Sequence, residues 1–333
     1  MKTGKLPEHT FKRAVLNPIW YRNRDFEFRA AVGHDGAVIG DMVTSMSTTA
    51  FYYEGNELYA LQNALNNIIA AGGKPYGIAV AVLLPEHSEE AVLRKITGNI
   101  SKKAALYEIE ILAGHTELVP TVSLPTITIT AYGSVLWNNR HKEVTEDMDI
   151  VMTKWTGLYG GAILADLKKD ELIGRYPRSY IETAAEYINY TSLIPELAVI
   201  QAFINEHPKD IYAAHDVSNG GVFGALWQML SACNIGAECR IRDILMKQEI
   251  IEICEYFDIN PYMLNGQGSI LMILKDGTEL VEMMHEADIE AAVIGKTQSG
   301  SGRKVLVGDE ERFLVPPKGD ALNVVFYGQK MPV

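Results

Sequence analysis

The sequence predicts an α/β (α+β) protein of two domains, and three observations lead to this prediction. Apolar runs typical of strands alternate with segments of helical periodicity through both halves of the chain. The chain has 333 residues, which is enough for two hydrophobic cores. A polar and charged stretch, Asn138 to Glu146, interrupts the alternation. We therefore expect an N-terminal domain over residues 1–145 and a larger C-terminal domain over residues 146–333.

Composition and charge restrict the possible partners. The chain is 47% hydrophobic and 22% charged, as in globular proteins, and its formal charge is −12. An acidic chain is a poor match for a phosphate backbone or an anionic membrane, so we expect neither a nucleic acid nor a membrane as partner. No apolar run has the length of a membrane span, and no signal peptide is visible. Three cysteines without a CxxC pair favour a reducing, cytoplasmic location.

The first half contains the segments expected of a sheet with helices. A polar turn at 33–36 enters a short strand, residues 77–84 form a buried strand, and helices are expected over 57–71 and 88–107. The apolar run 109–113 predicts another buried strand, which we expect to end at Gly114. His115, Thr116 and Glu117 would then emerge in a loop at the edge of the sheet.

Two polar patterns in this half admit more than one interpretation. Asn63, Asn66 and Asn67 lie in the first helix, although asparagine is a mediocre helix former. They form either a solvated face or a set of hydrogen-bonding groups at a site. The strand 126–132 alternates strictly, which predicts one buried face and one threonine-rich face. The threonine face is suited to meeting a partner subunit or to lining a cavity.

The second half repeats the alternation of strands and helices. Strands are expected at 149–152, 211–214, near 241, at 269–274 and at 291–296, and helices at 158–167, 222–232, 248–257 and 278–287. Residues 180–205 are mostly helical, with a break near Pro195. Between strand 211–214 and helix 222–232 lies His215-Asp216-Val217-Ser218-Asn219-Gly220-Gly221. A strand, a glycine loop and a helix N-terminus together present backbone N–H groups to an anion.

Six motifs in order resemble the aminoimidazole ribonucleotide (AIR) synthase superfamily, and in particular its hydrogenase expression/formation protein E branch. The resemblance covers nearly the whole chain. The motifs are Gly4-Lys5-Leu6-Pro7; Gly33-His34-Asp35-Gly36-Ala37-Val38-Ile39; Asn66-Asn67-Ile68-Ile69-Ala70-Ala71-Gly72-Gly73-Lys74-Pro75; Gly114-His115-Thr116-Glu117; Met152-Thr153-Lys154 with Gly157-Leu158; and His215-Asp216-Val217-Ser218-Asn219-Gly220-Gly221.

The resemblance implies a fold, ligands and a set of site residues. It implies an N-terminal domain that forms a homodimer through its sheet, a C-terminal α/β domain, and ATP with Mg²⁺ near the acidic loops and the dimer cleft. The implied nucleotide-binding residues are Lys5, Asp35, Asn67, Gly114, His115, Thr116, Glu117, Lys154, Asp216, Asn219, Gly220 and Gly221. Asp35 and Glu117 are the implied metal ligands. The alternatives are that Lys154 is solvated, that Asp216 caps a helix and that His215 is structural.

The chain departs from the family pattern where Mg²⁺ and a thiol would act. Val43-Thr44-Ser45-Met46-Ser47 lacks an aspartate, and Asn67, His115 and Tyr159 replace acidic residues of relatives. Mg²⁺ prefers carboxylate and phosphate oxygens, so we expect weak Mg²⁺ dependence. Relatives that convert a carbamoyl group to a thiocyanate carry a C-terminal cysteine, whereas the last cysteine here is Cys254. We expect that this reaction does not run in cis.

The sequence is therefore compatible with two functions. The first is an enzyme that binds a purine nucleotide and activates a small amide or carboxylate oxygen by phosphoryl transfer. The second is a non-catalytic binding partner, for example of another maturation protein, that kept the fold and lost metal ligands. The sequence identifies neither a substrate nor a catalytic residue. In either case we expect His115 and Glu117 to border a bound anion, since an imidazole can donate to a phosphate or ligate a transition metal.

Overall fold

A computed structural model describes residues 5–21, 30–49, 53–139, 141–316 and 319–328. The chain divides into two compact units. The smaller unit contains His34–Leu136, and the larger contains Trp137–Val333 together with Met1–Asn23 and Ala30–Gly33. Gly4 of the first motif and the last five residues, 329–333, lie outside the described residues. The functional assignment of the predicted domains 1–145 and 146–333 stays a prediction.

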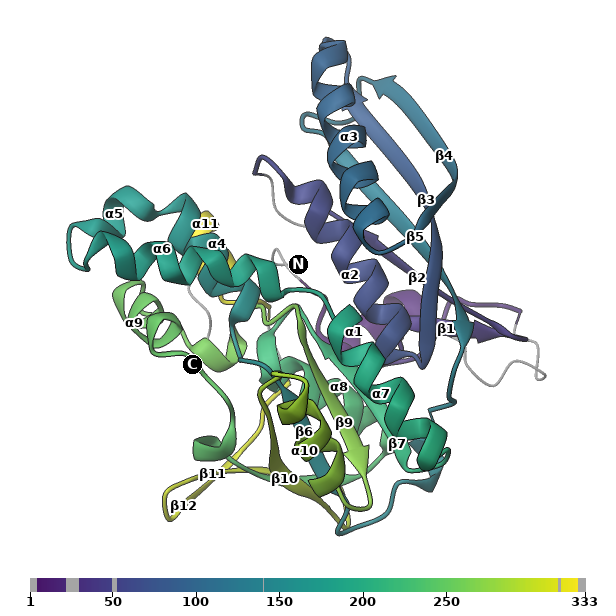
Figure 1. Cartoon of the computed structure of the whole chain (residues 1–333), viewed down its shortest axis with the longest axis vertical. Helices are drawn as coiled ribbons and strands as arrows, with labels where there is room; N and C mark the ends of the chain where they lie inside the picture. Colours follow the sequence, from purple (N-terminus) through teal and green to yellow (C-terminus); the bar gives the residue numbers. More distant parts are fainter. Residues whose placement is uncertain (1–4, 22–29, 50–52, 140, 317–318, 329–333) are drawn as a thin grey trace. The chain divides into compact units, whose positions relative to one another are not determined.

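The smaller unit is a five-stranded sheet with helices on one face (Figure 1). The strand order is β1-β2-β5-β3-β4, formed by β1 (Gly36–Ile39), β2 (Met42–Thr48), β5 (Thr126–Val135), β3 (Gly73–Pro85) and β4 (Glu110–Val119). Only the β3–β4 pairing is parallel. Helices α2 (Asn56–Ala70) and α3 (Glu90–Leu106) supply the apolar stripes predicted for them.

The two faces of this sheet differ because its strands alternate. The strand β5 buries Ile127, Ile129 and Ala131 against the helices, while the threonines between them point the other way and are half-buried. The predicted alternation of this strand is therefore confirmed. On the threonine side the described residues remain at least partly exposed, including Met46, which is 64% exposed. We call this side, built on Thr44, Met46, Thr48, Ala79, Ala81, Leu83, Thr126, Thr128, Thr130, Tyr132, His115 and Glu117, the open face.

The strand β4 differs from the prediction. It was expected to be buried and to end at Gly114, but it is an exposed edge strand that continues to Val119. The reason is the neighbouring strand: β3 offers ladder partners as far as Pro85, so pairing continues past the glycine. A side chain at Gly114 would lie 2.9 Å from the Val80 carbonyl oxygen, which explains a glycine inside the strand.

The larger unit is built on a seven-stranded sheet of order β12-β11-β8-β10-β6-β9-β7. These strands are β12 (Glu310–Phe313), β11 (Arg303–Val307), β8 (Gly236–Arg240), β10 (Ala291–Gln298), β6 (Asp149–Thr153), β9 (Ser269–Leu274) and β7 (Ile211–Val217). The predicted strand near residue 241 is β8, which ends at Arg240. The sequence did not predict β11, β12 or the short helix α11 (Leu322–Tyr327).

The helices of the larger unit follow the predicted periodic segments, except for the short helix at Lys169–Ile173, which the sequence did not predict. They are α4 (Leu158–Leu167), α5 (Lys169–Ile173), α6 (Arg178–Glu186), α7 (Ile194–Glu206), α8 (Gly221–Cys233), α9 (Gln248–Tyr256) and α10 (Thr278–Glu286). The break near Pro195 lies just before it, because Pro195 occupies the first turn of α7. Proline is tolerated there since the missing N–H would have no helical acceptor.

The N-terminal segment packs within the larger unit. Helix α1 (Glu8–Phe11) is followed by a π-helical turn, Lys12–Leu16. The indole of Trp227 on α8 donates a hydrogen bond to Glu8 at 2.8 Å, and Lys5 donates to Gln228 at 2.9 Å. Lys5, which was predicted to contact a nucleotide, thus has a partner on α8.

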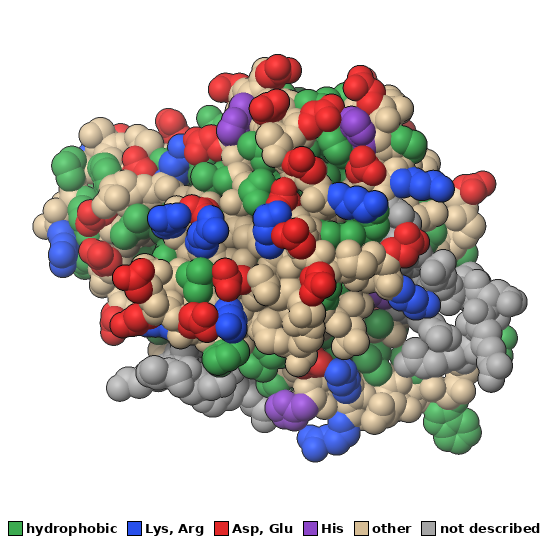
Figure 2. Space-filling model, turned by 90° about the horizontal axis from the view of Figure 1, so that it is seen from below, with side chains coloured by type: hydrophobic (Ala, Val, Ile, Leu, Met, Phe, Trp, Pro, Cys, Tyr) green, Lys and Arg blue, Asp and Glu red, His purple; other side chains and the backbone are tan. Residues whose placement is uncertain are grey.

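The surface carries charges of both signs. Figure 2 shows acidic side chains spread over the face drawn, with lysine and arginine between them rather than gathered in one basic patch. Among the described residues, no helix combines the length and the apolar character that a membrane crossing requires.

Candidate functional site

The asparagines of α2 form a buried polar stripe. Asn66 is fully buried and Asn67 is 5% exposed, so the interpretation as a solvated face is wrong. The Gln62 amide donates to Asn66 at 2.9 Å, and the Asn63 amide donates to Ser47 on β2 at 3.1 Å. Buried amides need hydrogen-bond partners, and the stripe supplies them to one another and to the sheet. It therefore presents preorganised hydrogen-bonding groups on the helix side of the sheet.

Asp35 lies beside the end of this stripe. The Ser45 hydroxyl on β2 donates to the Asp35 carbonyl oxygen at 2.9 Å. A Cβ on the next residue, Gly36, would lie 2.8 Å from the Ala71 side chain and 3.5 Å from the Asn67 carbonyl oxygen. The loop therefore approaches the end of α2 closely because residue 36 lacks a side chain. The Asp35 loop, Ser45 of β2 and the end of α2 at Asn67 therefore lie close together.

The residues of Gly114-His115-Thr116-Glu117 divide between the two faces of β4, since side chains alternate along a strand. Gly114 and Thr116 line an apolar groove of about 260 Å³ next to Ile100 of α3. His115 and Glu117 pair in register with Ala81 and Leu83 and belong to the open face. Their side chains are 65% and 56% exposed, and His115 Nε2 lies 3.1 Å from a Glu117 carboxylate oxygen. The predicted loop at a strand end is therefore wrong, and these two residues do not join the Asp35 cluster.

The same alternation separates Met46 and Asn67, two positions at which the resemblance led us to expect an acidic residue. Met46 points to the open face, opposite the helices, whereas its neighbours Ser45 and Ser47 are buried on the helix side. Asn67 belongs to α2 and thus to the helix side. Carboxylates introduced at 46 and 67 would lie on different faces, so Ser45 rather than Met46 is the position that could complete an acidic pair with residue 67.

Lys154 is buried in an ion pair. Its ammonium group lies 2.8 Å from Glu196 and donates to the carbonyl oxygens of Tyr190 at 2.9 Å and Ser192 at 2.6 Å. An ammonium group has three protons, and these three partners use them all. Burial raises the pKa of Glu196, although the Lys154 charge and the hydrogen bonds to it act to lower that pKa. The alternative of a solvated lysine is therefore wrong. The contact of Lys154 with a nucleotide stays a prediction, and these three partners leave no ammonium proton free for it.

The loop after β7 begins later than expected. The strand runs to Val217, so His215 and Asp216 lie within it and are 4% and 3% exposed. The His215 Nδ1 atom lies 2.7 Å from the Asp216 carbonyl oxygen. That contact agrees with the alternative of a structural histidine. The strand is longer than predicted because β9 pairs with it through Val217.

The helix N-terminus after this loop already faces a carboxylate of the same chain. Gly220, with φ +89°, caps α8, and its N–H donates to an Asp320 carboxylate oxygen at 2.8 Å. The Leu322 N–H donates to the other oxygen at 2.9 Å. Burial raises the pKa of Asp320 to about 6, against backbone hydrogen bonds from Gly220, Leu322 and Asn265 that lower it. The expected anion position is thus filled by an internal carboxylate.

Sequence reasoning missed Glu196 and Asp320, and the reason is their distance along the chain. Glu196 lies 42 residues from Lys154, and Asp320 lies 100 residues from Gly220. A buried carboxylate shows no periodic signal. A glutamate inside the apolar segment Leu193–Ile204 was the one available hint, since glutamate is rarely buried without a partner.

These observations define a class: a two-unit α/β protein whose smaller unit exposes one face of its sheet and whose larger unit buries an ion pair and a carboxylate at a helix N-terminus. Comparison with family models identifies the family. The model described as "AIR synthase related protein, N-terminal domain" matches residues 30–135, and the corresponding C-terminal model matches residues 148–308. The chain belongs to the AIR synthase-related family.

Individual relatives point to hydrogenase formation proteins. The chain is 24% identical over 285 residues to a Methanocaldococcus jannaschii protein named as a candidate hydrogenase expression/formation protein, covering 81% of this chain and 79% of that one. It is 21% identical over 253 residues to carbamoyl dehydratase HypE of Rhodobacter capsulatus, covering 74% and 70%.

Solved structures share the fold. HypE in a HypE–HypF complex superimposes with a TM-score of 0.75 at 17% identity, covering 92% of this chain and 99% of that one. HypE crystallised with ATP superimposes with a TM-score of 0.66 at 17% identity, covering 92% of each. The predicted two-sheet, AIR synthase-like fold is confirmed.

Proposed function

We propose that this protein binds a purine nucleotide, with ATP as the first candidate, and uses it to activate a small amide or carboxylate group. The observation that carries the proposal is the buried polar stripe of α2, which ends beside Asp35 at a position where the family motifs are retained. Membership of the family and the likeness to a HypE crystallised with ATP support it. In the proposed reaction, a substrate oxygen forms a bond to the γ-phosphorus of ATP. The bond from that phosphorus to the β–γ bridging oxygen breaks, and ADP leaves.

The cluster around Asp35 suits binding and orientation more than proton transfer. Residue 67 is a neutral asparagine rather than an acid, and the backbone at Gly36 approaches the end of α2 closely because residue 36 has no side chain. Such groups position phosphates by hydrogen bonding, and positioning is the main requirement of phosphoryl transfer. The acceptor substrate class is proposed from the relatives, one of which is named carbamoyl dehydratase.

The two predicted metal ligands belong to segments on opposite sides of the sheet in the smaller unit. Glu117 lies on the open face, whereas the backbone at Asp35 is bonded to Ser45 on the helix side. We therefore assign no step to Mg²⁺ and expect nucleotide binding to depend weakly on it. The change Asn67→Asp together with Ser45→Asp should create a Mg²⁺-dependent gain in affinity, whereas Asn67→Asp with Met46→Asp should not, because residue 46 faces away.

Thiol chemistry within this chain has no available nucleophile among its three cysteines. Cys233, Cys239 and Cys254 are all buried, and burial raises the pKa of each thiol to about 12. The thiolate is the reactive form, and a buried thiol with so high a pKa supplies almost none at neutral pH. The second candidate function, a non-catalytic partner of another maturation protein, is favoured by this observation and by a relative crystallised with HypF.

We also propose that the protein is a homodimer formed through the open face. That face carries Thr126, Thr128 and Thr130 with small apolar neighbours, and the described residues of the smaller unit leave it uncovered. One-sided sheets normally place their second face in water or against another layer. A second copy would cover it symmetrically.

Calorimetric titration with ATP, ADP and AMP, with and without Mg²⁺, tests the nucleotide proposal. We expect micromolar to millimolar ATP affinity that changes little with chelator, and loss of affinity in Asp35→Asn but not in the matched control Asp41→Asn. Asp41 is an exposed aspartate at the β1–β2 turn of the same unit. Absence of binding by all three nucleotides would refute it. Binding without release of ADP, in the presence of candidate amides, would favour the non-catalytic alternative.

A further inference from the structure

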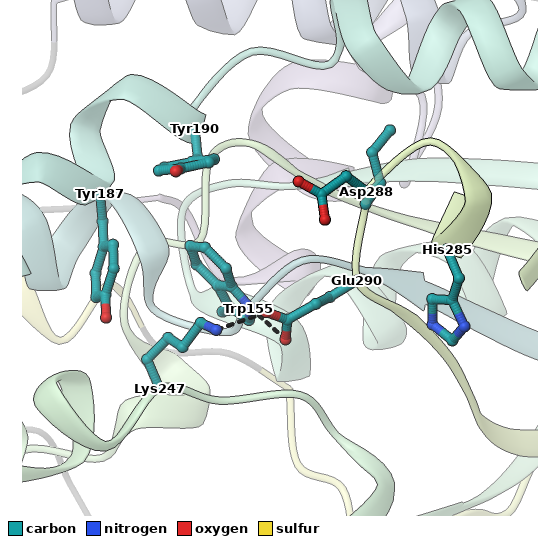
Figure 3. Close-up of a pocket in the computed structure, with 8 residues that line it drawn as sticks. Trp155, Tyr187, Tyr190, Lys247, His285, Asp288 and Glu290 are labelled. Carbon is teal, nitrogen blue, oxygen red and sulfur yellow. Dashed lines mark hydrogen bonds and ion pairs between the residues drawn. The ribbon is translucent and has the colours of Figure 1, made fainter.

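A second pocket lies entirely within the larger unit, and none of its lining residues belongs to the Asp35 cluster. It has a volume of about 360 Å³ and is lined by Trp155, Tyr187, Tyr190, Lys247, His285, Asp288, Ile289 and Glu290. Figure 3 shows the three aromatic side chains on one side of the pocket and the Asp288 carboxylate directed toward them. The nucleotide proposal uses none of these side chains.

The aromatic wall is held rigidly. The Trp155 ring lies 5.1 Å from the Tyr187 ring and 5.4 Å from the Tyr190 ring, centroid to centroid. The Trp155 indole donates to Glu290 at 2.9 Å, and the Tyr187 hydroxyl donates to Glu249 at 2.8 Å. The buried Lys154 ammonium fixes the Tyr190 backbone through its carbonyl oxygen. A wall fixed in this way needs little reorganisation when a ligand binds.

The wall already holds an ammonium group. Lys247 Nζ lies 4.3 Å from the centre of the Trp155 ring, within the range of a cation–π interaction, and 2.5 Å from Glu290. Burial acts to raise the pKa of Glu290, but hydrogen bonds from Lys247 and Trp155 outweigh it and the pKa is lowered. Glu290 is therefore a carboxylate at neutral pH. The contact between the Lys247 ammonium group and the Trp155 ring shows that this pocket accommodates a positive charge.

The pocket contains one carboxylate whose charge is neutralised by no cation of the described part of the chain. Lys247 neutralises Glu290, whereas the Asp288 carboxylate has no hydrogen bond or ion pair among the residues that the structure describes. Tyr190 is 51% exposed, so its ring is accessible to a ligand, while Trp155 and Tyr187 are almost fully covered. An aromatic face opposite an unneutralised carboxylate attracts a positive charge from both sides.

We infer that this pocket binds a small organic cation through its ammonium group, held between the Tyr190 ring and the Asp288 carboxylate. The lining is a poor match for an anion, because its lysine is already paired with Glu290 and the Nε2 atom of its histidine, His285, lies 2.9 Å from the Ala291 carbonyl oxygen. The inference goes beyond the proposed nucleotide function and does not rest on it. ATP affinity should be the same in variants of this pocket, so the two proposals fail separately.

Matched ligands isolate the effect of the charge. Choline and 3,3-dimethyl-1-butanol have nearly the same shape and differ in the positive charge, and butylammonium serves as a second cation. We expect choline or butylammonium to bind the full chain at least about tenfold more tightly than the neutral alcohol in calorimetric titration. Equal affinity for the alcohol, or no binding of either cation at millimolar concentration, overturns the inference.

Substitutions in the pocket test whether the cation binds at this site. Tyr190→Leu should weaken cation binding roughly fivefold or more, and Tyr190→Phe should retain it because the ring is kept. Asp288→Asn should weaken it severalfold. Asp258→Asn is the matched control, because Asp258 is also an exposed aspartate that follows a helix with positive φ, 51° against 59°. Unchanged affinity in both Tyr190→Leu and Asp288→Asn would place the cation elsewhere and refute the site.

Discussion

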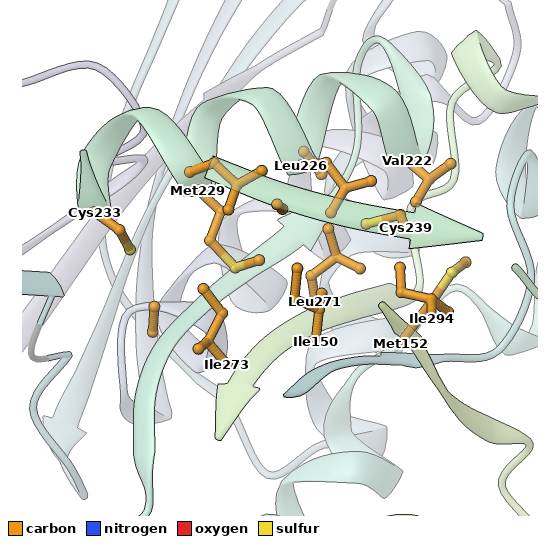
Figure 4. Close-up of a cluster of buried hydrophobic side chains, with 14 of the residues drawn as sticks. Ile150, Met152, Val222, Leu226, Met229, Cys233, Cys239, Leu271, Ile273 and Ile294 are labelled. Carbon is orange, nitrogen blue, oxygen red and sulfur yellow. The ribbon is translucent and has the colours of Figure 1, made fainter. Parts of the chain in front are cut away.

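The two sheets of this protein differ in how far their strands are buried. In the larger unit, β6, β7 and β9 are buried along their whole length, with α8 packed on one face (Figure 4) and α10 packed on β10. In the smaller unit, β5 is buried on alternate residues only, and β4 is exposed along all but its last residue. A strand buried on both faces has no free surface, whereas a strand buried on one face has a second surface available for association.

The contrast extends to polar groups. The larger unit encloses charges and satisfies them internally, as Lys154 with Glu196 and Asp320 with α8 show. The smaller unit keeps its ionisable His115 and Glu117 exposed. Mutations of the buried charges in the larger unit should therefore change stability, and mutations on the open face should change association or binding. The predictions below test this division, from the largest expected effect to the smallest.

Breaking the buried pair should have the largest effect. Lys154→Met leaves the Glu196 carboxylate buried without its cation, and we expect a loss of about 3–5 kcal/mol in the free energy of unfolding. The double variant Lys154→Met with Glu196→Met should recover most of that loss. Urea denaturation followed by circular dichroism measures both. A single variant within 1 kcal/mol of the parent would show that the pair is not what stabilises this region.

A charge on the open face should separate the proposed dimer. Thr130→Lys places two like charges in a symmetric interface, which costs several kcal/mol and should raise the dissociation constant roughly a hundredfold or more. Ser101→Lys on the exposed side of α3 is the control. Light scattering at micromolar concentration should give a dimer for the parent and the control and a monomer for Thr130→Lys. A monomeric parent would refute the dimer.

The buried carboxylate predicts a pH dependence of stability. The pKa of Asp320 is raised from 3.8 to about 6 in the folded protein, so the folded state binds a proton more readily than the unfolded state. The protein should therefore gain stability as pH falls through 6. Between pH 7 and pH 5 this group should contribute about 1 kcal/mol, and the contribution should vanish in Asp320→Asn. Denaturation at both pH values compares the two proteins, and identical pH slopes would contradict the assignment.

The smallest effect concerns His115. Its side chain is 65% exposed, so His115→Ala should leave the melting temperature unchanged. If an anion binds beside it, affinity should fall roughly fivefold through loss of one charge-assisted hydrogen bond. His87→Ala, another exposed histidine of the same unit, is the control. A clear loss of melting temperature with unchanged nucleotide affinity would make His115 structural.

Periodicity predicted most elements because their burial is regular. The helices α2, α4 and α10 and the strands β6 and β9 match their predicted ranges within one or two residues. The errors arose where a partner strand, rather than the local sequence, determines where pairing ends, as at Gly114 of β4 and at His215 of β7. Lys154 was misread for a related reason. Its partners Glu196, Tyr190 and Ser192 come from a helix and a turn that no local pattern connects to it.

Asp320 has a consequence for any ligand that approaches the N-terminus of α8. A carboxylate held in place by the folded chain competes at a high effective concentration, on the order of millimolar or above. A free anion present at micromolar concentration would lose this competition, however well it matched the backbone N–H groups of Gly220 and its neighbours. Protonation of Asp320 weakens the internal competitor, so the pKa near 6 also sets the pH below which that position becomes easier to occupy.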